Sequence, residues 1–283
     1  MMQREVERAL TTIAQAPGIS SVAPASPSTR PVVPPGVAAS QLAGSLVNSC
    51  KYVGFEDTFR GSADEIRRRL SDYLPLFAGA SDVLDLGCGR GEFLDLLREH
   101  SVTGRGVDIN HEMVEVCRER QLDVVEGDGL TFLEQAPDAS LGGLFASQVV
   151  EHLQPDQLLR LLSLAFHKLR PGALVVLETI NPACWFAFFE SYIRDITHVR
   201  PIHPDTLKFL LRANGFQRVD IQFRAPYPER GKLQLVPVPD PIAGDKRAIR
   251  PAADLAETFN ANVDKINHLL FTHLDYAAIG VRP

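Results

Sequence analysis

Glycines and a carboxylate accompany one short hydrophobic run in a pattern suited to binding a nucleotide-like ligand. The run 83–86 contains Asp85 and leads into Gly87, Gly89 and Gly91 at alternate positions. Glycine lets the backbone turn sharply and approach a ligand closely, where a Cβ atom would collide. The residues that follow the glycines have the composition of a helix. The sequence therefore predicts a ligand-binding turn between a strand and a helix.

The spacing of these glycines favours one class of ligand over another. A dinucleotide-binding turn requires G-x-G-x-x-G, and Glu92 stands where its third glycine would be. A carboxylate in the first turn of a helix would repel a pyrophosphate, which binds the partly positive helix N-terminus. It would not repel a positively charged sulfonium group. The turn is thus predicted to accept a sulfonium cofactor rather than a dinucleotide.

Acidic residues end the next two predicted strands. Asp108, followed by Ile109, lies about twenty residues beyond the turn, where a carboxylate can accept both hydroxyls of a ribose. Asp128, followed by Gly129, ends the third strand and is predicted to accept the amino group of an adenine. One acid alone could be no more than a solvated strand end. Acids at the carboxyl ends of neighbouring strands, where open sheets bind ligands, together favour a binding site.

A second group of chemistry-bearing residues follows the fourth predicted strand. Gln148, Glu151 and His152 are predicted to fall on one face of a helical turn, and His198 lies further along the chain. An imidazole can accept a proton near neutral pH, and a carboxylate can orient it. His152 and His198 are therefore the candidate bases. Two carboxylates, Glu178 and Asp195, are candidates for orienting an imidazole or binding the acceptor.

These residues are positioned by alternating strand and helix signals. Such alternation predicts an α/β fold with a doubly wound, mostly parallel sheet. Ser62, with Glu65 three residues later, is predicted to cap the first helix, and His203 beside Pro204 to open a later one. Strands are expected at 82–86, 104–108, 122–126, 142–147, 172–178, 216–223 and 276–281, and helices at 62–77, 91–99, 111–120, 130–135, 156–168, 204–213 and 254–271.

Composition divides the chain into an extension and one domain. Residues 1–48 are expected to form a flexible N-terminal extension, because the stretch 17–40 is rich in proline, alanine and serine. Residues 49–283 are expected to form the domain, with a substrate lid at 181–203 after the fifth strand and an insertion at 224–272 before the last. The lid carries aromatic residues that are predicted to share one helix face: Trp185, Phe186, Phe188, Phe189 and Tyr192.

Charge and cysteine content narrow the class of protein. The chain has 29 basic and 35 acidic residues and a net charge of −6, so no overall positive field attracts nucleic acid. No apolar run is long enough to span a membrane. The cysteines form no C-x-x-C pair, which suits free thiols in a reducing compartment. We therefore expect a cytoplasmic protein with no nucleic-acid substrate and no membrane span.

Four segments together resemble the class I S-adenosylmethionine-dependent methyltransferases. They are D-x-G-x-G-x-G from residue 85, V-D-I from 107, E-G-D from 126 and V-E-H-L from 150. The resemblance extends over 50–283 and implies a Rossmann-like sheet of seven strands with S-adenosyl-L-methionine as cofactor. The cofactor-binding residues that it implies are Asp85, Gly87, Cys88, Gly89, Asp108, Ile109, Asp128, Gly129 and Gln148.

A narrower resemblance concerns the acceptor. The segments 51–62, 178–182, 195–201 and 275–280 are similar to a bacterial group of glycan methyltransferases, and most of all to the mycobacterial sugar methyltransferases of methylmannose polysaccharide synthesis. This similarity implies a saccharide acceptor. It also implies that Tyr52 and Arg60 close over the cofactor, with Arg60 facing its carboxylate. The alternative for Arg60 is a surface salt bridge.

The segment from Gln148 to His152 suggests a metal site by resemblance. Plant small-RNA 2'-O-methyltransferases and ubiquinone-pathway O-methyltransferases hold a divalent metal there with E-x-x-E-H. This chain has Gln148 in place of the first glutamate, and an amide oxygen can still bind Mg²⁺. The implied ligands are Gln148, Glu151, His152 and His198. The alternative is that Glu151 caps the next helix and His152 only lines the pocket.

These observations predict an O-methyltransferase that acts on a saccharide hydroxyl, with His152, His198 and Glu178 in catalytic roles. A bound Mg²⁺ would lower the pKa of that hydroxyl. Two other functions stay open at this stage. One is methylation of a small phenolic or quinone-like acceptor, and the other is a catalytically silent binding protein with the cofactor fold. The aromatic lid would also suit contact with a second subunit in a homodimer.

Overall fold

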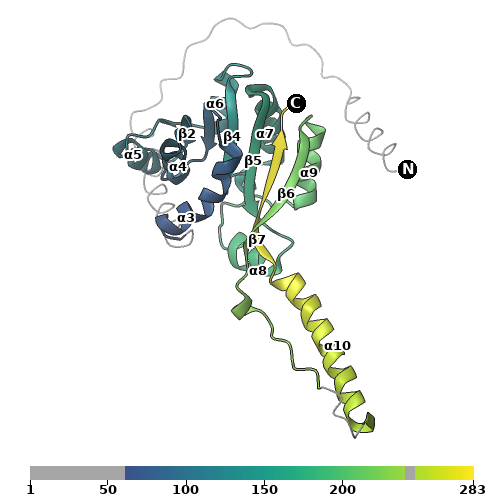
Figure 1. The fold of residues 1–283 in the computed structure, drawn as a ribbon. Coiled ribbons are helices and arrows are strands. Elements are labelled where there is room, and N and C mark those ends of the chain that lie inside the picture. Colours follow the sequence, from purple (N-terminus) through teal and green to yellow (C-terminus); the bar gives the residue numbers. More distant parts are fainter. Residues whose placement is uncertain (1–60, 240–245) are drawn as a thin grey trace, which may run out of the picture. The chain divides into compact units, whose positions relative to one another are not determined.

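The protein folds around one mixed β-sheet with helices on both faces. A computed structural model describes residues 61–239 and 246–283 (Figure 1). The sheet has seven strands in the order β3-β2-β1-β4-β5-β7-β6. The strands are β1 (Val83–Leu86), β2 (Gly104–Asp108), β3 (Val124–Glu126), β4 (Leu141–Ser147), β5 (Leu169–Ile180), β6 (Gln217–Pro226) and β7 (His273–Val281).

Strand direction changes on each side of β7. Strands β1 to β5 pair in parallel, whereas β7 pairs antiparallel with both β5 and β6. The predicted seven-stranded, mostly parallel α/β sheet is therefore confirmed. The strand order reverses at β1, which lies between β2 and β4. Open α/β sheets bind their ligands at such a switch point, beyond the carboxyl ends of the strands.

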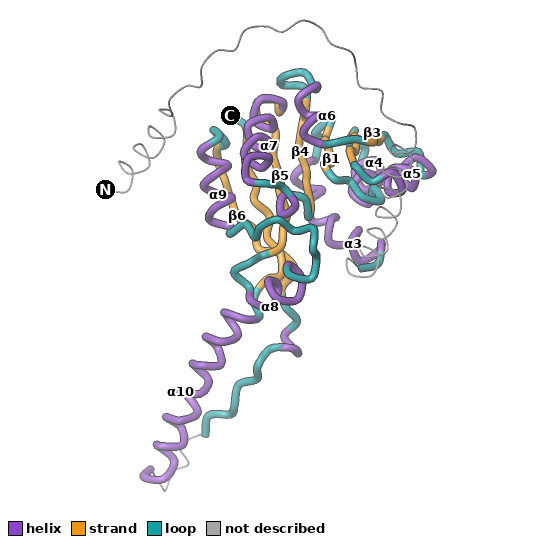
Figure 2. Tube along the Cα trace, turned by 180° about the vertical axis from the view of Figure 1, so that it is seen from behind, coloured by secondary structure: helices purple, strands orange, loops and turns teal. Residues whose placement is uncertain are grey.

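Alternate residues of the strands face two hydrophobic layers. Val83, Phe145 and Val176 share one buried cluster with α3 (Ala63–Leu70), the 3₁₀ turn η1 (Ser71–Phe77) and α4 (Glu92–Glu99). Their sequence neighbours Leu84 and Leu144 face the other layer, which includes α6 (Gly129–Gln135), α7 (Pro155–Lys168) and α9 (Pro204–Ala213). Helix α5 (His111–Glu119) packs by β2 and β3 (Figure 2). Strands buried on both faces carry apolar residues at nearly every position.

Helix starts follow the sequence signals closely. The Ser62 side chain accepts the backbone N–H of Glu65, as predicted for the cap of α3. His203 begins α9, and its ring nitrogen accepts the backbone N–H of Asp205. The predicted helix at 62–77 is shorter than expected, because after Leu70 the chain tightens into the 3₁₀ turn that contains Pro75. Proline lacks the N–H that an α-helix would need at that point.

The five aromatic residues of the segment 181–203 do not share one helix face, so that prediction is wrong. The segment consists of the short turn α8 (Trp185–Ala187) and the π-helical turn η3 (Phe188–Tyr192), followed by coil. The wider π turn directs the aromatic rings to different neighbours. Phe186 packs on Tyr227 and Phe271, and Phe188 stacks on Tyr192 at 5.6 Å. The Trp185 and Phe189 side chains stay exposed.

The insertion before the last strand forms an arm. The short turn η4 (Glu229–Gly231) and an extended segment lead to the long helix α10 (Lys246–Leu270), which leads away from the sheet in both views (Figures 1 and 2). The predicted helix at 254–271 begins earlier than expected, in spite of Pro251. Pro251 lies inside the helix, where it supplies no N–H to the carbonyl four residues before it. In the ranges 61–239 and 246–283, no helix is long and apolar enough to cross a bilayer.

A buried tyrosine ties the sheet to the segment that follows the lid. The Tyr276 hydroxyl on β7 donates to the carbonyl of Ile202 at 2.7 Å. Tyr276→Phe would leave that carbonyl unpaired, so we expect the free energy of unfolding to fall by about 1–3 kcal/mol in urea titration. Tyr227→Phe is the matched control, because within the described part of the chain the Tyr227 hydroxyl makes no hydrogen bond. An equal effect of the two variants would contradict the prediction.

Candidate active site

The turn after β1 contains three glycines in left-handed conformation, of which Gly89 has φ +51°. Gly87 has φ +69° and Gly91 has φ +78°. A Cβ on Gly87 would lie 2.5 Å from Cγ2 of Val149, and one on Gly91 would lie 2.5 Å from Cδ1 of Leu122. No side chain fits at either position. The predicted strand–turn–helix is therefore present, and it packs directly against the segment that follows β4.

Asp108 at the end of β2 shapes this turn. Its carboxylate accepts the backbone N–H of Gly89 and the backbone N–H of Asn110, each at 2.8 Å. These two bonds fix the carboxylate at the turn, where the sequence predicts a ribose-binding acid. Ile109 next to it is 76% exposed. An exposed apolar side chain beside a ribose-binding acid is suited to cover an adenine ring.

The other predicted cofactor residues surround the same edge of the sheet. Asp85 is buried in β1, between Gly106 of β2 and Phe145 of β4. The Cys88 side chain packs in a buried cluster with Cys117, so only its backbone can face a ligand in the turn. Asp128 caps α6 by accepting the backbone N–H of Thr131 at 2.8 Å, with Gly129 packed on Leu86. The roles of these residues in cofactor binding stay predictions.

Glu92 is paired in a way that the sequence did not indicate. It is buried in the first turn of α4, and its carboxylate accepts Nε–H of Arg90 at 2.8 Å. The ion pair neutralises much of the negative charge that was expected to repel a pyrophosphate. Discrimination against a dinucleotide therefore rests on the space around the turn more than on that charge.

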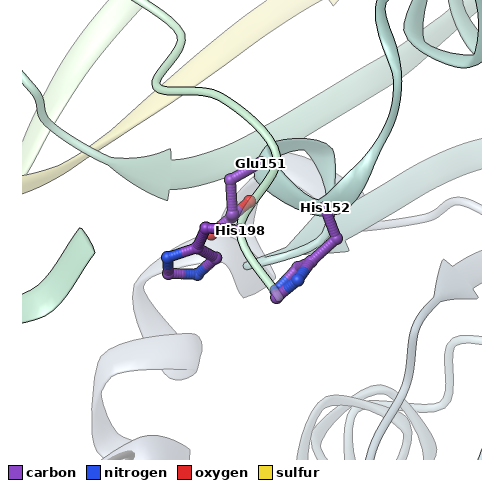
Figure 3. A group of neighbouring side chains, drawn as sticks. All are labelled: Glu151, His152 and His198. Atoms are coloured by element: carbon purple, nitrogen blue, oxygen red, sulfur yellow. The ribbon is translucent and has the colours of Figure 1, made fainter. Parts of the chain in front are cut away.

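Three side chains with metal-ligating atoms meet beyond β4. Glu151 and His152 lie on the 3₁₀ turn η2 (Val150–His152), and His198 comes from the coil after η3 (Figure 3). One potential ligand atom from each lies within 4.8 Å of the others. The backbone N–H of Val199 donates to the carbonyl of Glu151 at 2.9 Å, which holds the coil against the turn. The structure thus brings together three of the four predicted metal ligands.

The Glu151 carboxylate is buried with little compensation. The residue is 1% exposed, and neither side-chain oxygen makes a hydrogen bond of normal geometry to the part of the chain that the structure describes, although Thr179 lies close enough to oppose the rise in its pKa. Burial raises the pKa of Glu151 to about 8, and the nearby carboxylates of Asp275 and Glu178 act in the same direction. A buried acid of this kind is either protonated or paired with a cation. The donor set therefore fits a bound metal ion.

Hydrogen bonds fix which nitrogen of each histidine faces the group. His198 Nδ1 lies 2.6 Å from the carbonyl of Tyr192, so Nδ1 carries the proton. Thr197 donates its hydroxyl proton to Asp195 at 2.6 Å and so accepts from His152 Nδ1 at 3.0 Å. In the neutral form each imidazole therefore carries its lone pair on Nε2, the atom that in His198 lies 3.8 Å from Oδ2 of Asp195. Sequence reasoning proposed Asp195 for orienting an imidazole but missed Thr197.

Gln148, the fourth predicted ligand, makes a different contact. It precedes the turn with φ +58°, so it does not share a helical face with Glu151 and His152, and that expectation is wrong. Its amide nitrogen donates to Asp275 at 3.3 Å, and its backbone N–H donates to the carbonyl of Glu178 at 2.9 Å. Ligation of a metal by Gln148 stays a prediction.

A buried acidic network lies beside this group. Glu178 accepts hydrogen bonds from the Tyr73 hydroxyl and from Ser147 Oγ, the latter at 2.8 Å. Burial, with Glu178 nearby, raises the pKa of Asp275 to about 7. Glu178 is therefore held by two protein donors rather than directed at either histidine. A catalytic role of Glu178, as a residue that positions other groups, stays a prediction. Tyr52 and Arg60, which were predicted to close over the cofactor, lie outside the described residues.

Comparisons with known proteins agree on the class. The methyltransferase domain family matches residues 57–221. A crystal structure of an S-adenosylmethionine-dependent methyltransferase from Archaeoglobus fulgidus is 39% identical, with a TM-score of 0.72, and the match covers 81% of this chain and 99% of that one. A structure of such an enzyme from Thermotoga maritima shares the fold at 13% identity and a TM-score of 0.57, over 82% of this chain and 97% of that one.

A curated relative from Mycolicibacterium smegmatis, described as a probable S-adenosylmethionine-dependent methyltransferase, is 32% identical over 141 residues. That match covers 49% of this chain and about half, 53%, of the relative. The chain belongs to the methyltransferase domain family, with the class I fold. Its methyl donor is S-adenosyl-L-methionine, as the glycine turn predicted.

The contact between Gly87 and Val149 generates the first prediction at this site. Gly87→Ala places a methyl group against the Val149 side chain in a conformation that L-residues rarely adopt, so we expect S-adenosylhomocysteine affinity to fall at least tenfold in calorimetry. Gly79→Ala is the control, because Gly79 has φ +76° but open space around its Cβ position. Unchanged affinity in Gly87→Ala would show that the turn adapts.

A second prediction concerns the hydrogen bond between His152 and Thr197. Thr197→Val removes the oxygen that fixes the His152 tautomer, so we expect Mn²⁺ affinity to fall about 10–100-fold with cofactor affinity retained. Thr197→Ser keeps the hydroxyl and is expected to restore binding. Titration calorimetry with Mn²⁺ measures both variants. Equal affinity of the Val and Ser variants would show that Thr197 does not orient a ligand.

Proposed function

We propose that the chain transfers a methyl group from S-adenosyl-L-methionine to a hydroxyl oxygen of a saccharide, assisted by a divalent cation. The observation that carries the proposal is the group of Glu151, His152 and His198, which brings a buried carboxylate and two imidazoles within 4.8 Å of one another. The methyl-donor turn packs on Val149, two residues before Glu151. Donor and acceptor chemistry are thus adjacent.

The reaction is a displacement at the sulfonium methyl group. The acceptor oxygen forms a bond to the methyl carbon, the carbon–sulfur bond breaks, and its electron pair stays on sulfur. A saccharide hydroxyl is a poor nucleophile, so its proton must be removed and its oxygen held in line with sulfur. Without a cation, Nε2 of His152 or His198 would accept this proton. With a cation held by both histidines, the hydroxyl would be acidic enough to lose its proton to water. The bonds to Thr197 and Tyr192 keep the two rings in their orientation.

The donor set indicates which cation would bind. Glu151, His152 and His198 provide one carboxylate and two imidazoles. Mg²⁺ prefers oxygen ligands, whereas imidazole nitrogens favour first-row transition metals. We therefore propose a first-row divalent metal such as Mn²⁺ or Fe²⁺ in place of the Mg²⁺ expected from the sequence. When bound, such a cation would lower the pKa of a hydroxyl that reaches it.

The saccharide part of the proposal rests on the acceptor side of the site. Trp185 and Phe189 expose aromatic faces on the turns α8 and η3, and such faces suit the apolar side of a sugar ring. The similarity of segments 178–182 and 195–201 to sugar methyltransferases supports the same acceptor. A phenolic acceptor is the second candidate, because Tyr192 and His198 stack at 4.7 Å and could extend to a flat aromatic ring.

Turnover assays test the proposal. We expect methyl transfer to mannosides, loss of at least tenfold in kcat with EDTA, and recovery with Mn²⁺. Glu151→Gln and His152→Ala are expected to lose turnover but keep S-adenosylhomocysteine affinity. His203→Ala is the matched control, since His203 only caps α9.

Each component of the proposal has its own contradicting result. Turnover that is unaffected by EDTA would refute the role of the cation. Turnover on phenols but not on mannosides would refute the saccharide acceptor. Cofactor binding without turnover on any hydroxyl acceptor would favour a silent binding protein.

A further inference from the structure

The arm before β7 is built as a rigid two-part element. The extended segment 232–239 runs beside α10 and is tied to it by two asparagine side chains. Asn260 accepts the backbone N–H of Val236 and donates to its carbonyl, each at 2.9 Å. Asn267 does the same with Leu233, at 2.9 and 2.8 Å. The arm is therefore held along its length by paired bonds, rather than at its ends alone.

The asparagines mark the face of α10 that the extended segment covers. Asn260 and Asn267 are seven residues apart, and the buried residues Ala256 and Val263 show the same spacing. At 3.6 residues per turn these four positions share one side of the helix. Ala256 and Val263 are the two residues of the described part of α10 that are fully buried. This face of α10 is thus covered by the extended segment of the same chain.

The neighbouring face carries an apolar stripe with no partner in the described chain. Leu255, Phe259, Ile266 and Leu269 are 71%, 47%, 42% and 42% exposed. They recur at intervals of four, seven and three residues, which keeps them on one side of the helix for about 21 Å. Exposed single apolar residues are ordinary, but a continuous stripe at this spacing is the pattern of a helix that packs against another helix.

We propose that this stripe binds the same stripe of a second copy of the chain, with the two α10 helices antiparallel. Asn262 lies at the centre of the stripe, with Leu255 seven residues before it and Leu269 seven residues after it. Such a pattern matches itself when one helix is reversed. A twofold interface requires a self-complementary surface of this kind.

The charged residues beside the stripe also favour an antiparallel arrangement of the two α10 helices. Asp254 borders it in the first half of the helix, and Lys265 borders it on the same side in the second half. An antiparallel pair places each Asp254 on the same side of the interface as Lys265 of the other copy, whereas a parallel pair removes this match. Glu257, Asp264 and His268 lie on the opposite side of the helix.

Sedimentation equilibrium of the full chain tests the association. We expect twice the chain mass of 31.1 kDa at micromolar concentration. The double variant Phe259→Lys with Ile266→Lys is expected to sediment at 31.1 kDa and to keep its S-adenosylhomocysteine affinity, which shows that the domain is folded. Phe209→Lys on α9, at a residue 64% exposed, is the control and is expected to stay dimeric.

Cysteine cross-linking tests the direction. In a Cys50→Ser background the three described cysteines are buried, so introduced thiols react selectively. We expect a disulfide when Leu255→Cys and Leu269→Cys chains are mixed and oxidised, but not when either is oxidised alone. Cross-linking within each single variant would overturn the antiparallel arrangement. A monomeric wild type, or a double variant that still dimerises, would overturn the interface, and a monomer that floats with anionic lipid vesicles would assign the stripe to a membrane surface.

Discussion

The site depends on the close packing of the turn after β1 against the segment after β4. Gly87 leaves no room for a Cβ because the Val149 side chain fills that space. The first segment belongs to the methyl-donor side and the second leads directly into Glu151 and His152. Neither can shift alone without opening a gap or a clash, since protein interiors are packed as densely as crystals. The distance between the glycine turn and the group of Glu151, His152 and His198 is therefore set by the packing of the sheet.

A second layer of contacts holds the acceptor side. The coil from Asp195 to Arg200 is attached to the 3₁₀ turn through the carbonyl of Glu151 and through the bond from His152 to Thr197. The same coil supplies His198. Residues 46 positions apart in the chain thus form one group, and the histidine orientations follow from backbone and hydroxyl partners rather than from free rotation. Catalytic groups held in this way lose little entropy when a substrate binds.

The amino-acid sequence alone predicts those features of the fold whose signal lies in neighbouring residues. The alternation of strands and helices, the glycine turn and the caps at Ser62 and His203 follow from spacing and residue type. The sequence was insufficient where position depends on the partner strand. Asp275 reaches Gln148 only because β7 runs antiparallel beside β5, which places Asp275 opposite Ile180. The π-helical turn at 188–192 likewise arises from packing and has no propensity signal. The position of Thr197 could have been predicted from the sequence, because an Asp-x-Thr segment favours the local bond that the backbone N–H of Thr197 makes with Asp195.

The paired asparagine bonds of the arm impose a rule on its length. Between Leu233 and Val236 an extended chain advances about 10 Å, and between Asn260 and Asn267 a helix advances about 10.5 Å. The two advances agree, so both asparagines meet their backbone partners without strain. Adding or removing one residue in either part would put the second pair out of register. Related chains can therefore lengthen this arm only in matched steps, of three residues in the extended segment for every two turns of helix.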